Sequence, residues 1–245
     1  MQTLGIIPAR YHSTRFPGKV LAEIQGKPMI QHVYEQAQKT RLLQEVVIAT
    51  DHEQVVQAVK NFGGKVVLTD ANHQSGTDRC AEVIGLSEFQ HYELVVNIQG
   101  DEPFIHPEQI DKLVSFLKNN AAFEIATLAK KVEDQHQLFN PNTVKVVFGQ
   151  RQNALYFSRN TIPYLRDEPL GNWLQKADFY KHIGLYAFKN KTLRSIAKLP
   201  VGQLENLEKL EQLRWLENGY AIGIQLTELE TQGIDTKDEW LRVRG

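Results

Sequence analysis

Three cationic residues lie close together near the amino terminus, in a stretch that also holds small polar residues. Arg10, Arg15 and Lys19 fall within ten residues and alternate with Ser, Thr and Gly. They follow a short apolar run at residues 4–7, and Pro8 is expected to end that strand because proline has no backbone N–H. In α/β proteins such a loop holds phosphates through backbone N–H groups and cationic side chains. We predict a phosphate-binding loop; a solvated basic loop is the alternative, and two prolines and a glycine argue against it.

Asp101 and Asp235 are candidate ligands of a metal ion. Asp101 follows the predicted strand at residues 93–98 and should project into the crevice beyond it. A carboxylate near bound phosphates is typical of a magnesium site, because Mg²⁺ prefers oxygen ligands. Aspartate beside glycine is also typical of a turn, so the position alone leaves both interpretations open. Asp235 is a second candidate, with a helix N-cap as its alternative.

Glu211 is a carboxylate at the border of an apolar helix face. A helix is predicted over residues 203–217, and Glu211 lies four residues after Leu207 on its leucine-rich side. A local ion pair with Arg214 or Lys209 explains this position slightly better than presentation to a polar ligand does.

Several well-known motifs are absent from the sequence. Val20 stands where a Walker loop needs Ser or Thr to bind magnesium, and no Gly-x-Gly-x-x-Gly follows a strand. No Gly-x-Ser-x-Gly elbow and no His-Glu-x-x-His pair occurs, which argues against a serine hydrolase and a zinc protease. Most of the eight histidines are expected at the surface or at helix caps, with His182, beside a strand, as the exception.

The composition is that of a folded protein with no extreme charge. The chain has 245 residues, 42% of them hydrophobic, and a formal net charge of −1, which argues against binding nucleic acid by bulk electrostatics. Cys80 is the single cysteine, so no disulfide can form within the chain. No apolar run is long enough to span a membrane, and the amino terminus lacks a secretory pattern. We therefore expect a soluble cytoplasmic protein.

The first half of the chain alternates strand and helix patterns, which predicts βαβ units and a mostly parallel sheet. The expected strands are residues 4–7, 45–50, 65–69, 93–98 and 123–129. The expected helices are residues 28–39, 52–61, 77–86 and 107–118. The strands are continuous apolar runs, as they are when helices cover both faces of a sheet.

The second half is less regular. Strands are expected at residues 143–148, 154–157, 182–188 and 221–226. Residues 159–178 are rich in loop-forming residues. We predict one domain over residues 1–245, with residues 140–188 as an inserted smaller lobe.

Polar residues follow four of the predicted parallel strands. Ligands bind beyond the carboxyl ends of the strands in open α/β sheets. The polar runs at these ends are residues 8–19, 50–52, 75–79 and 99–103. Their recurrence at one edge predicts a binding site there.

Many short runs, spread over nearly the whole chain, carry a specific resemblance. They are IPAR at 7–10, STRFPGK at 13–19, GKPMI at 26–30, ATD at 49–51, SGTDR at 75–79, NIQGDEP at 97–103, NPNTVKVV at 140–147, ALYFSR at 154–159, IPY at 162–164, HIGLYA at 182–187, LEQLR at 210–214 and GIDT at 233–236. With these runs the chain resembles the 3-deoxy-manno-octulosonate (Kdo) cytidylyltransferases of lipopolysaccharide biosynthesis.

The resemblance implies an α/β fold with a Rossmann-like nucleotidyltransferase sheet and an activity that transfers CMP from CTP to Kdo. It implies that the triphosphate and the nucleotide are bound by Pro8, Ala9, Arg10, Arg15, Lys19, Ser75, Gly76 and Asp101. Asp101 and Asp235 would ligate Mg²⁺, and with Arg10 and Lys19 they would be the catalytic residues.

The resemblance also implies an acidic-sugar site and a homodimer, with the inserted lobe contributing to both. The sugar ligands would be Gln99, Arg159, Arg166, His182, Tyr186, Glu211 and Gln212. Alternative acceptors are the 8-amino analogue of Kdo or a sialic acid, and another nucleoside triphosphate would give a different product. A non-catalytic protein that binds a nucleotide sugar is the alternative from another class.

Overall fold

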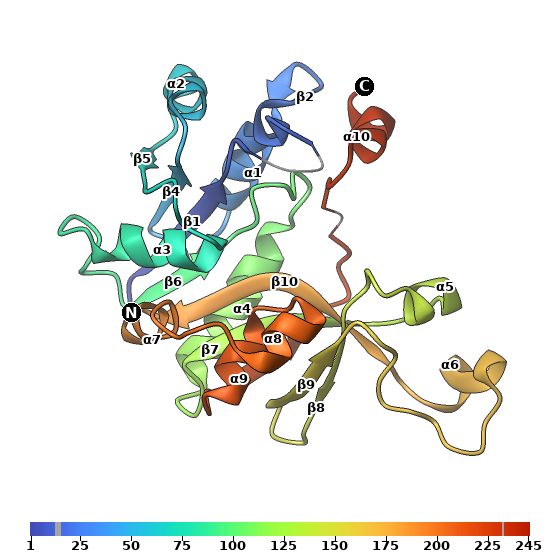
Figure 1. Cartoon of the computed structure of the whole chain (residues 1–245). Helices are drawn as coiled ribbons and strands as arrows, with labels where there is room; N and C mark the ends of the chain where they lie inside the picture. Colours follow the sequence, from blue (N-terminus) through green and yellow to red (C-terminus); the bar gives the residue numbers. More distant parts are fainter. Residues whose placement is uncertain (13–15, 232) are drawn as a thin grey trace.

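The chain folds around one mixed sheet, and most neighbours along its central path of seven strands are parallel (Figure 1). The computed structural model describes residues 1–12, 16–231 and 233–245. The strand order is β11-β7-β10-β6-β1-β4-β5, and β10 runs antiparallel to β6 and β7. The strands are β1 (Thr3–Ala9), β4 (Glu45–Thr50), β5 (Val66–Leu68), β6 (Leu94–Asn97), β7 (Ile125–Lys131), β10 (Tyr180–Lys189) and β11 (Ile222–Leu226). The predicted mostly parallel α/β sheet is confirmed.

Helices cover both faces of this sheet. The helices on one face are α1 (Met29–Gln38), α2 (Glu53–Asn61) and α4 (Pro107–Asn119). Those on the other are α3 (Gly76–Gly85), α7 (Asn190–Ile196), α8 (Gln203–Glu208) and α9 (Gln212–Glu217). Each face has its own apolar core, because the strand side chains alternate between the two sides.

The predicted helices of the first half form within a residue or two of the expected bounds, and their ends have clear causes. Pro107 occupies the first turn of α4, where its missing N–H costs nothing. The Ser75 hydroxyl accepts from the Asp78 N–H at 3.1 Å while Asp78 accepts from the Ser75 N–H, a capping box that fixes the start of α3.

Strand β1 continues through Pro8, so the prediction that this proline ends the strand is wrong. Pro8 stays in register with Ala49 of β4, whereas the pairing with β6 on the other side ends at Ile6. The Ile6 carbonyl accepts from Ile98 on that side. Residue 8 faces the same side as residue 6, where β6 has already ended, so no ladder hydrogen bond is lost.

The helix predicted over residues 203–217 is also wrong as one element, because it is broken between α8 and α9. Lys209 has a φ of 53°, which is left-handed backbone. The Glu208 carbonyl accepts from the Arg159 Nε at 2.7 Å, and the Glu208 carboxylate accepts from Ser158 and the Arg159 N–H. These contacts with β9 hold Glu208 and end the first helix, and the second begins just after Glu211.

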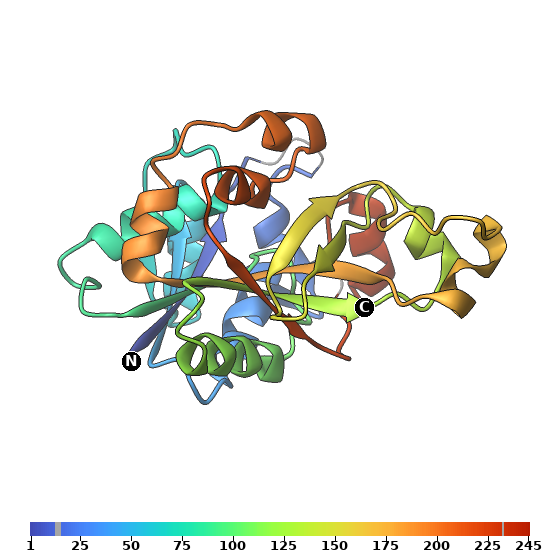
Figure 2. The ribbon, with the colours of Figure 1, turned by 90° about the horizontal axis from the view of Figure 1, so that it is seen from below.

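A smaller group of elements extends from one end of the sheet (Figures 1 and 2). It comprises α5 (Gln135–Phe139), β8 (Lys145–Phe148), β9 (Ala154–Ser158), the 3₁₀ turn at Leu170–Asn172 and α6 (Trp173–Lys176). Val132, Leu138, Trp173 and Phe179 form its own apolar cluster. The second half of β10 pairs with β6 and β7, so the predicted lobe boundary at residue 188 lies inside a strand of the central sheet.

The remaining elements pack together near the loops of one sheet edge. They are the 3₁₀ turn at Lys19–Leu21, β2 (Glu23–Ile24), β3 (Lys27–Pro28) and α10 (Lys237–Val243). Residues after β11 run back to α10, which lies beside β2 (Figure 1). In the described ranges, no helix combines the length and the apolar character needed to cross a bilayer.

His182 on β10 is held as a neutral imidazole. Its Nε2 lies 3.0 Å from the Thr127 hydroxyl, which donates towards the carbonyls of Ile183 and Leu185, so the ring N–H donates to Thr127. The ring packs edge-on against Phe157. Burial lowers the pKa of His182 to about 3, which disfavours the protonated form.

The free energy of unfolding should therefore fall as the pH is lowered from about 6.5 towards 3, because the unfolded chain binds a proton that the folded His182 excludes. This one group contributes a slope of about 1.4 kcal/mol per pH unit in that window. Urea unfolding from pH 7 to pH 4 measures it. His182→Gln should lose this part of the slope, whereas the exposed His136→Gln should keep it; equal slopes in all three proteins would contradict the assignment.

Candidate nucleotide site

Lys19, Asp101 and Asp235 converge at the carboxyl edge of the sheet. The Lys19 ammonium lies 2.6 Å from Asp101 Oδ2 and 3.1 Å from Asp235 Oδ1. The lysine side chain is 10% exposed, whereas those of the aspartates are 30% and 45% exposed. The contact thus joins the loops after β1 and β6, as the prediction of a shared edge requires, and it adds the segment after β11.

The backbone holds the two aspartates in place. The Ile234 N–H donates to the Asp101 carbonyl at 2.9 Å, and the Ile234 side chain is buried against Ile24 and Met29. The Asp235 N–H donates to Glu239 on α10 at 2.8 Å. Asp235 is therefore fixed by a direct backbone link to the loop that carries Asp101.

Gly100 allows this loop to pass close to β1. A Cβ atom at this position would lie 2.7 Å from the Pro8 carbonyl oxygen, closer than real contacts allow. The residue before Asp101 must therefore be glycine if the loop is to keep its path across the end of the strand.

The two carboxylates suit a divalent cation. The aspartates bring their carboxylate oxygens together beside the Lys19 ammonium. Carboxylate oxygens are the ligands that Mg²⁺ prefers, and this ion usually takes one or two of them beside phosphates and water. In the described part of the chain, no group of three or more His, Cys, Asp or Glu side chains is arranged around a possible metal. The residues present thus fit a magnesium ion shared with a nucleotide.

Glu102 is a third carboxyl group at the site, which the sequence analysis missed. Burial, together with the charges of Asp101 and Asp235, raises the pKa of Glu102 to about 8. At neutral pH this group therefore carries a proton and adds little to the negative charge of the cluster. Its position directly after Asp101 was the only signal in the sequence.

Part of the predicted phosphate loop, including Arg10 and Gly18, lies within the described residues. Arg10 is exposed, and its Nη1 lies 3.5 Å from the Gln74 carbonyl, across from the end of β1. The Gly18 N–H donates to the Tyr11 carbonyl at 2.9 Å and closes the loop. Arg15 lies outside the described residues, so its predicted role stays a prediction.

The loop before α3 lies against the end of β1. A Cβ at Gly76 would lie 3.0 Å from Cγ of Pro8, so Pro8 and Gly76 are close neighbours. Ala9, the last residue of β1, is buried. The structure thus brings the predicted nucleotide residues Pro8, Ala9, Ser75 and Gly76 to one place.

Most of the predicted sugar residues lie on β10 and around the start of α9. Tyr186 and Gln212 are buried, and Gln99 donates to the Gly184 carbonyl at 3.0 Å. Glu211 accepts from the Thr77 hydroxyl at 2.7 Å and lies 3.5 Å from Arg214, so the predicted local ion pair exists beside a longer-range contact.

The ionisation of these groups is shifted by their surroundings. Burial raises the pKa of Glu211, and burial together with that nearby carboxylate raises the pKa of the Tyr186 phenol well above its usual range. Thr77, which the sequence analysis did not single out, is the hydroxyl that holds Glu211 beside α3.

The two arginines among the predicted sugar ligands are placed differently. The Arg159 guanidinium donates to the carbonyls of Glu208, Pro141 and Lys209. Arg166 is 89% exposed and forms an ion pair with its neighbour Asp167. Among the described residues, Arg166 forms no hydrogen bond or ion pair with the other predicted ligands of the sugar.

Comparison with known proteins identifies the family. Residues 4–226 match the family model described as Cytidylyltransferase. A 3-deoxy-manno-octulosonate cytidylyltransferase of Parabacteroides distasonis is 52% identical over 98% of this chain and 95% of its own. An 8-amino-3,8-dideoxy-manno-octulosonate cytidylyltransferase of Shewanella pealeana is 49% identical over 96% of this chain and 94% of its own.

Solved structures agree with the sequence relatives. CMP:2-keto-3-deoxy-manno-octonic acid synthetase complexed with CTP superposes with a TM-score of 0.91 and 41% identity, over 100% of this chain and 97% of the other. A 4-diphosphocytidyl-2C-methyl-D-erythritol synthase of Anaerococcus prevotii, with a TM-score of 0.63 and 14% identity, shares the fold over 99% of this chain and 96% of the other. By its sequence and its fold, the chain belongs to the cytidylyltransferases, in the family of the 3-deoxy-manno-octulosonate enzymes.

Proposed function

We propose that this protein transfers CMP from CTP to the anomeric hydroxyl of Kdo and releases pyrophosphate. The observation that carries the proposal is the Lys19 ammonium held between Asp101 and Asp235, beside the nucleotide loops. The relatives named for this reaction, and the similar structure that holds CTP, support the same activity.

The reaction is an in-line displacement at the α-phosphorus of CTP. A bond forms from the anomeric oxygen of the sugar to phosphorus, while the bond from phosphorus to the bridging oxygen of pyrophosphate breaks. Arg10 and Lys19 offset the negative charge of the phosphates and of the leaving group. The nucleotide loops hold CTP in line with the hydroxyl, and this positioning supplies much of the rate.

Asp101 and Asp235 are the residues that would hold Mg²⁺. Bound there, the ion would neutralise phosphate charge and lower the pKa of the attacking hydroxyl. When CTP brings its phosphates to the site, they offer Lys19 acceptors that replace part of its contact with the carboxylates. The raised pKa of Glu102 reduces the negative charge that the phosphates of CTP would meet.

The acceptor site is proposed to bind the sugar through polar side chains. We assign Gln99, His182, Tyr186, Glu211 and Gln212 to the polar groups of Kdo. Arg159 and Arg166 remain proposed ligands of the sugar. Arg166 is exposed and forms an ion pair with Asp167.

The 8-amino analogue of Kdo is a second candidate acceptor, since the relative from Shewanella pealeana is named for it. The amine differs from the Kdo hydroxyl by a positive charge at neutral pH. A competition assay that offers Kdo, its 8-amino analogue and a sialic acid with CTP distinguishes the three by the ratio of their kcat/KM values.

We further propose a homodimer that works in the cytoplasm on the route to lipopolysaccharide. Exposed apolar side chains on the lobe support a contact with a second copy, among them Phe139 (40% exposed), Tyr164 (76%) and Leu170 (56%). Burying such side chains between two copies is favourable. Light scattering of the purified protein measures its oligomeric state.

The proposed activity predicts pyrophosphate release that needs CTP, Kdo and Mg²⁺ together. A coupled phosphate assay should give turnover with CTP and little with UTP, GTP or ATP, and EDTA should abolish it because the paired carboxylates then lack their ion. Binding of CTP without any pyrophosphate release would instead favour a non-catalytic nucleotide-sugar sensor.

Asp101→Asn should retain the fold and lower kcat by a hundredfold or more, about 2.7–4 kcal/mol by analogy with the loss of one stabilising donor. The amide keeps the shape of the side chain but removes the negative charge that faces Lys19 and the metal. Asp111→Asn is the matched control, because Asp111 on α4 accepts from the N–H groups of Arg41 and Leu42. Near-normal turnover of Asp101→Asn would remove Asp101 from the site.

A further inference from the structure

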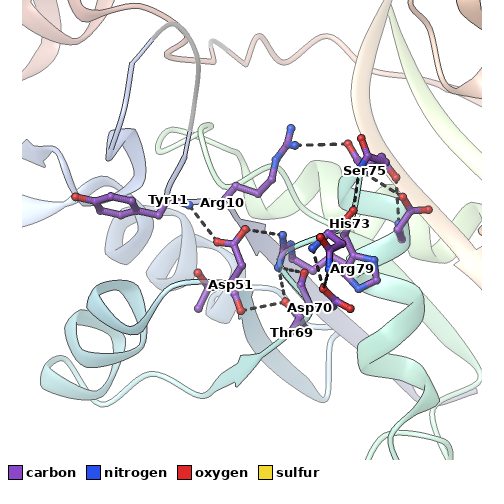
Figure 3. A network of polar contacts seen from close by, with 12 residues as sticks. Arg10, Tyr11, Asp51, Thr69, Asp70, His73, Ser75 and Arg79 are labelled. Carbon is purple, nitrogen blue, oxygen red and sulfur yellow. Dashed lines mark hydrogen bonds and ion pairs between the residues drawn. The ribbon is translucent and has the colours of Figure 1, made fainter.

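Asp51, at the end of β4, contacts two loops with its two carboxylate oxygens (Figure 3). Oδ2 lies 3.0 Å from Nη2 of Arg79 on α3, and Oδ1 accepts from the Tyr11 N–H at 3.4 Å. The Arg79 side chain is fully buried and that of Asp51 is 8% exposed. One carboxylate thus links Tyr11, at the start of the phosphate loop, to helix α3, which begins at Gly76 directly after Ser75.

The Arg79 side chain also forms hydrogen bonds with residues that directly follow β5. Its Nη1 donates to the Thr69 hydroxyl and lies 3.4 Å from the Asp70 carbonyl. The Thr69 N–H and hydroxyl both donate to the Thr50 carbonyl, at 2.8 and 3.0 Å. The first turn of α3 is therefore tied to the ends of β4 and β5, and Asp51 receives its partner in a fixed place.

The phosphate loop is fixed on the other side of the same carboxylate. The Tyr11 ring stacks on His52 with a centroid distance of 3.9 Å and an interplanar angle of 13°. The Tyr11 carbonyl accepts from Gly18 at 2.9 Å, which closes the loop. Arg10, the neighbour of Tyr11, reaches the Gln74 carbonyl at 3.5 Å, just before Ser75. The two nucleotide loops therefore meet at Asp51 and at Arg10.

We propose that Asp51, acting with Arg79, is a positioning residue that sets the spacing between the phosphate loop and the loop at residues 72–76. The proposal rests on the proposed function, in which one nucleotide bridges these two loops. A carboxylate suits the task because both of its oxygens accept hydrogen bonds. Asparagine has one acceptor, so its NH₂ group must face either the Arg79 guanidinium or the Tyr11 N–H, donor against donor.

The spacing of the two loops should matter for CTP and not for the acceptor sugar. In Asp51→Asn we expect the dissociation constant of CTP, measured by calorimetry with Mg²⁺ and no sugar, to rise about tenfold, which corresponds to about 1.4 kcal/mol. The KM for CTP should rise in parallel, while the KM for Kdo should stay within about twofold.

Glu45→Gln is the matched control, because Glu45 lies at the opposite end of the same strand. Its carboxylate accepts from Lys65 at 2.5 Å and from the Tyr92 hydroxyl at 2.6 Å. This variant also exchanges a carboxylate for an amide beside a cation, so it should lower the melting temperature without changing the affinity for CTP. A merely structural role of Asp51 would make the two variants alike, and that result would overturn the proposal.

A second variant covers the case in which Asp51→Asn does not fold at the assay temperature. Arg79→Lys keeps a positive charge near Asp51 but cannot also serve Thr69 and Asp70, so it should weaken CTP binding and leave the KM for Kdo unchanged. Unchanged CTP binding in a folded variant would overturn the proposal.

A titration of the unaltered protein distinguishes a failure of this proposal from a failure of the proposed function. The protein is titrated with all four nucleoside triphosphates, and failure to use CTP overturns the proposed function alone. The variants are then compared on the nucleotide that binds, and a selective loss of its affinity supports the positioning role of Asp51.

Discussion

The site depends on an ammonium group held between two carboxylates. Asp101 and Asp235 lie 82 and 216 positions away from Lys19 in the sequence, and their contacts with it join the first, middle and last parts of the chain. Bringing two like charges together is unfavourable unless a cation lies between them. Lys19 supplies that cation in the folded chain, and the proposed metal and nucleotide phosphates would meet at the same place.

The sheet makes this contact possible. The carboxyl ends of β1, β4, β5 and β6 meet at one edge because these strands are parallel, so the loops that follow them are neighbours. The antiparallel β10 lies beside β6 and carries the candidate sugar residues His182 and Tyr186 to the same region. One edge would therefore serve both substrates of the proposed transfer.

The loops at this edge of the sheet have little regular secondary structure, and specific hydrogen bonds hold them in place. Asp51 links two of them through opposite oxygens, and the Ile234 N–H links the segment before Asp235 to the Asp101 carbonyl. Gly100 allows the loop that carries Asp101 to pass close to Pro8. Contacts of this kind fix the geometry of the loops around Lys19, Asp101 and Asp235.

Local patterns in the sequence determined the alternating strands and helices, the capping of α3, the cationic loop and the carboxyl-edge position of Asp101, because periodicity and capping depend on residues near one another. Family motifs added the proposed nucleotide and sugar residues. The tertiary structure alone decided that Pro8 stays in β1, that contacts from β9 break the helix before Glu211, that Arg159 is engaged by three carbonyls and that Glu102 is buried beside two charges. Each of these depends on what a distant segment places beside the residue, and no local pattern specifies that neighbour.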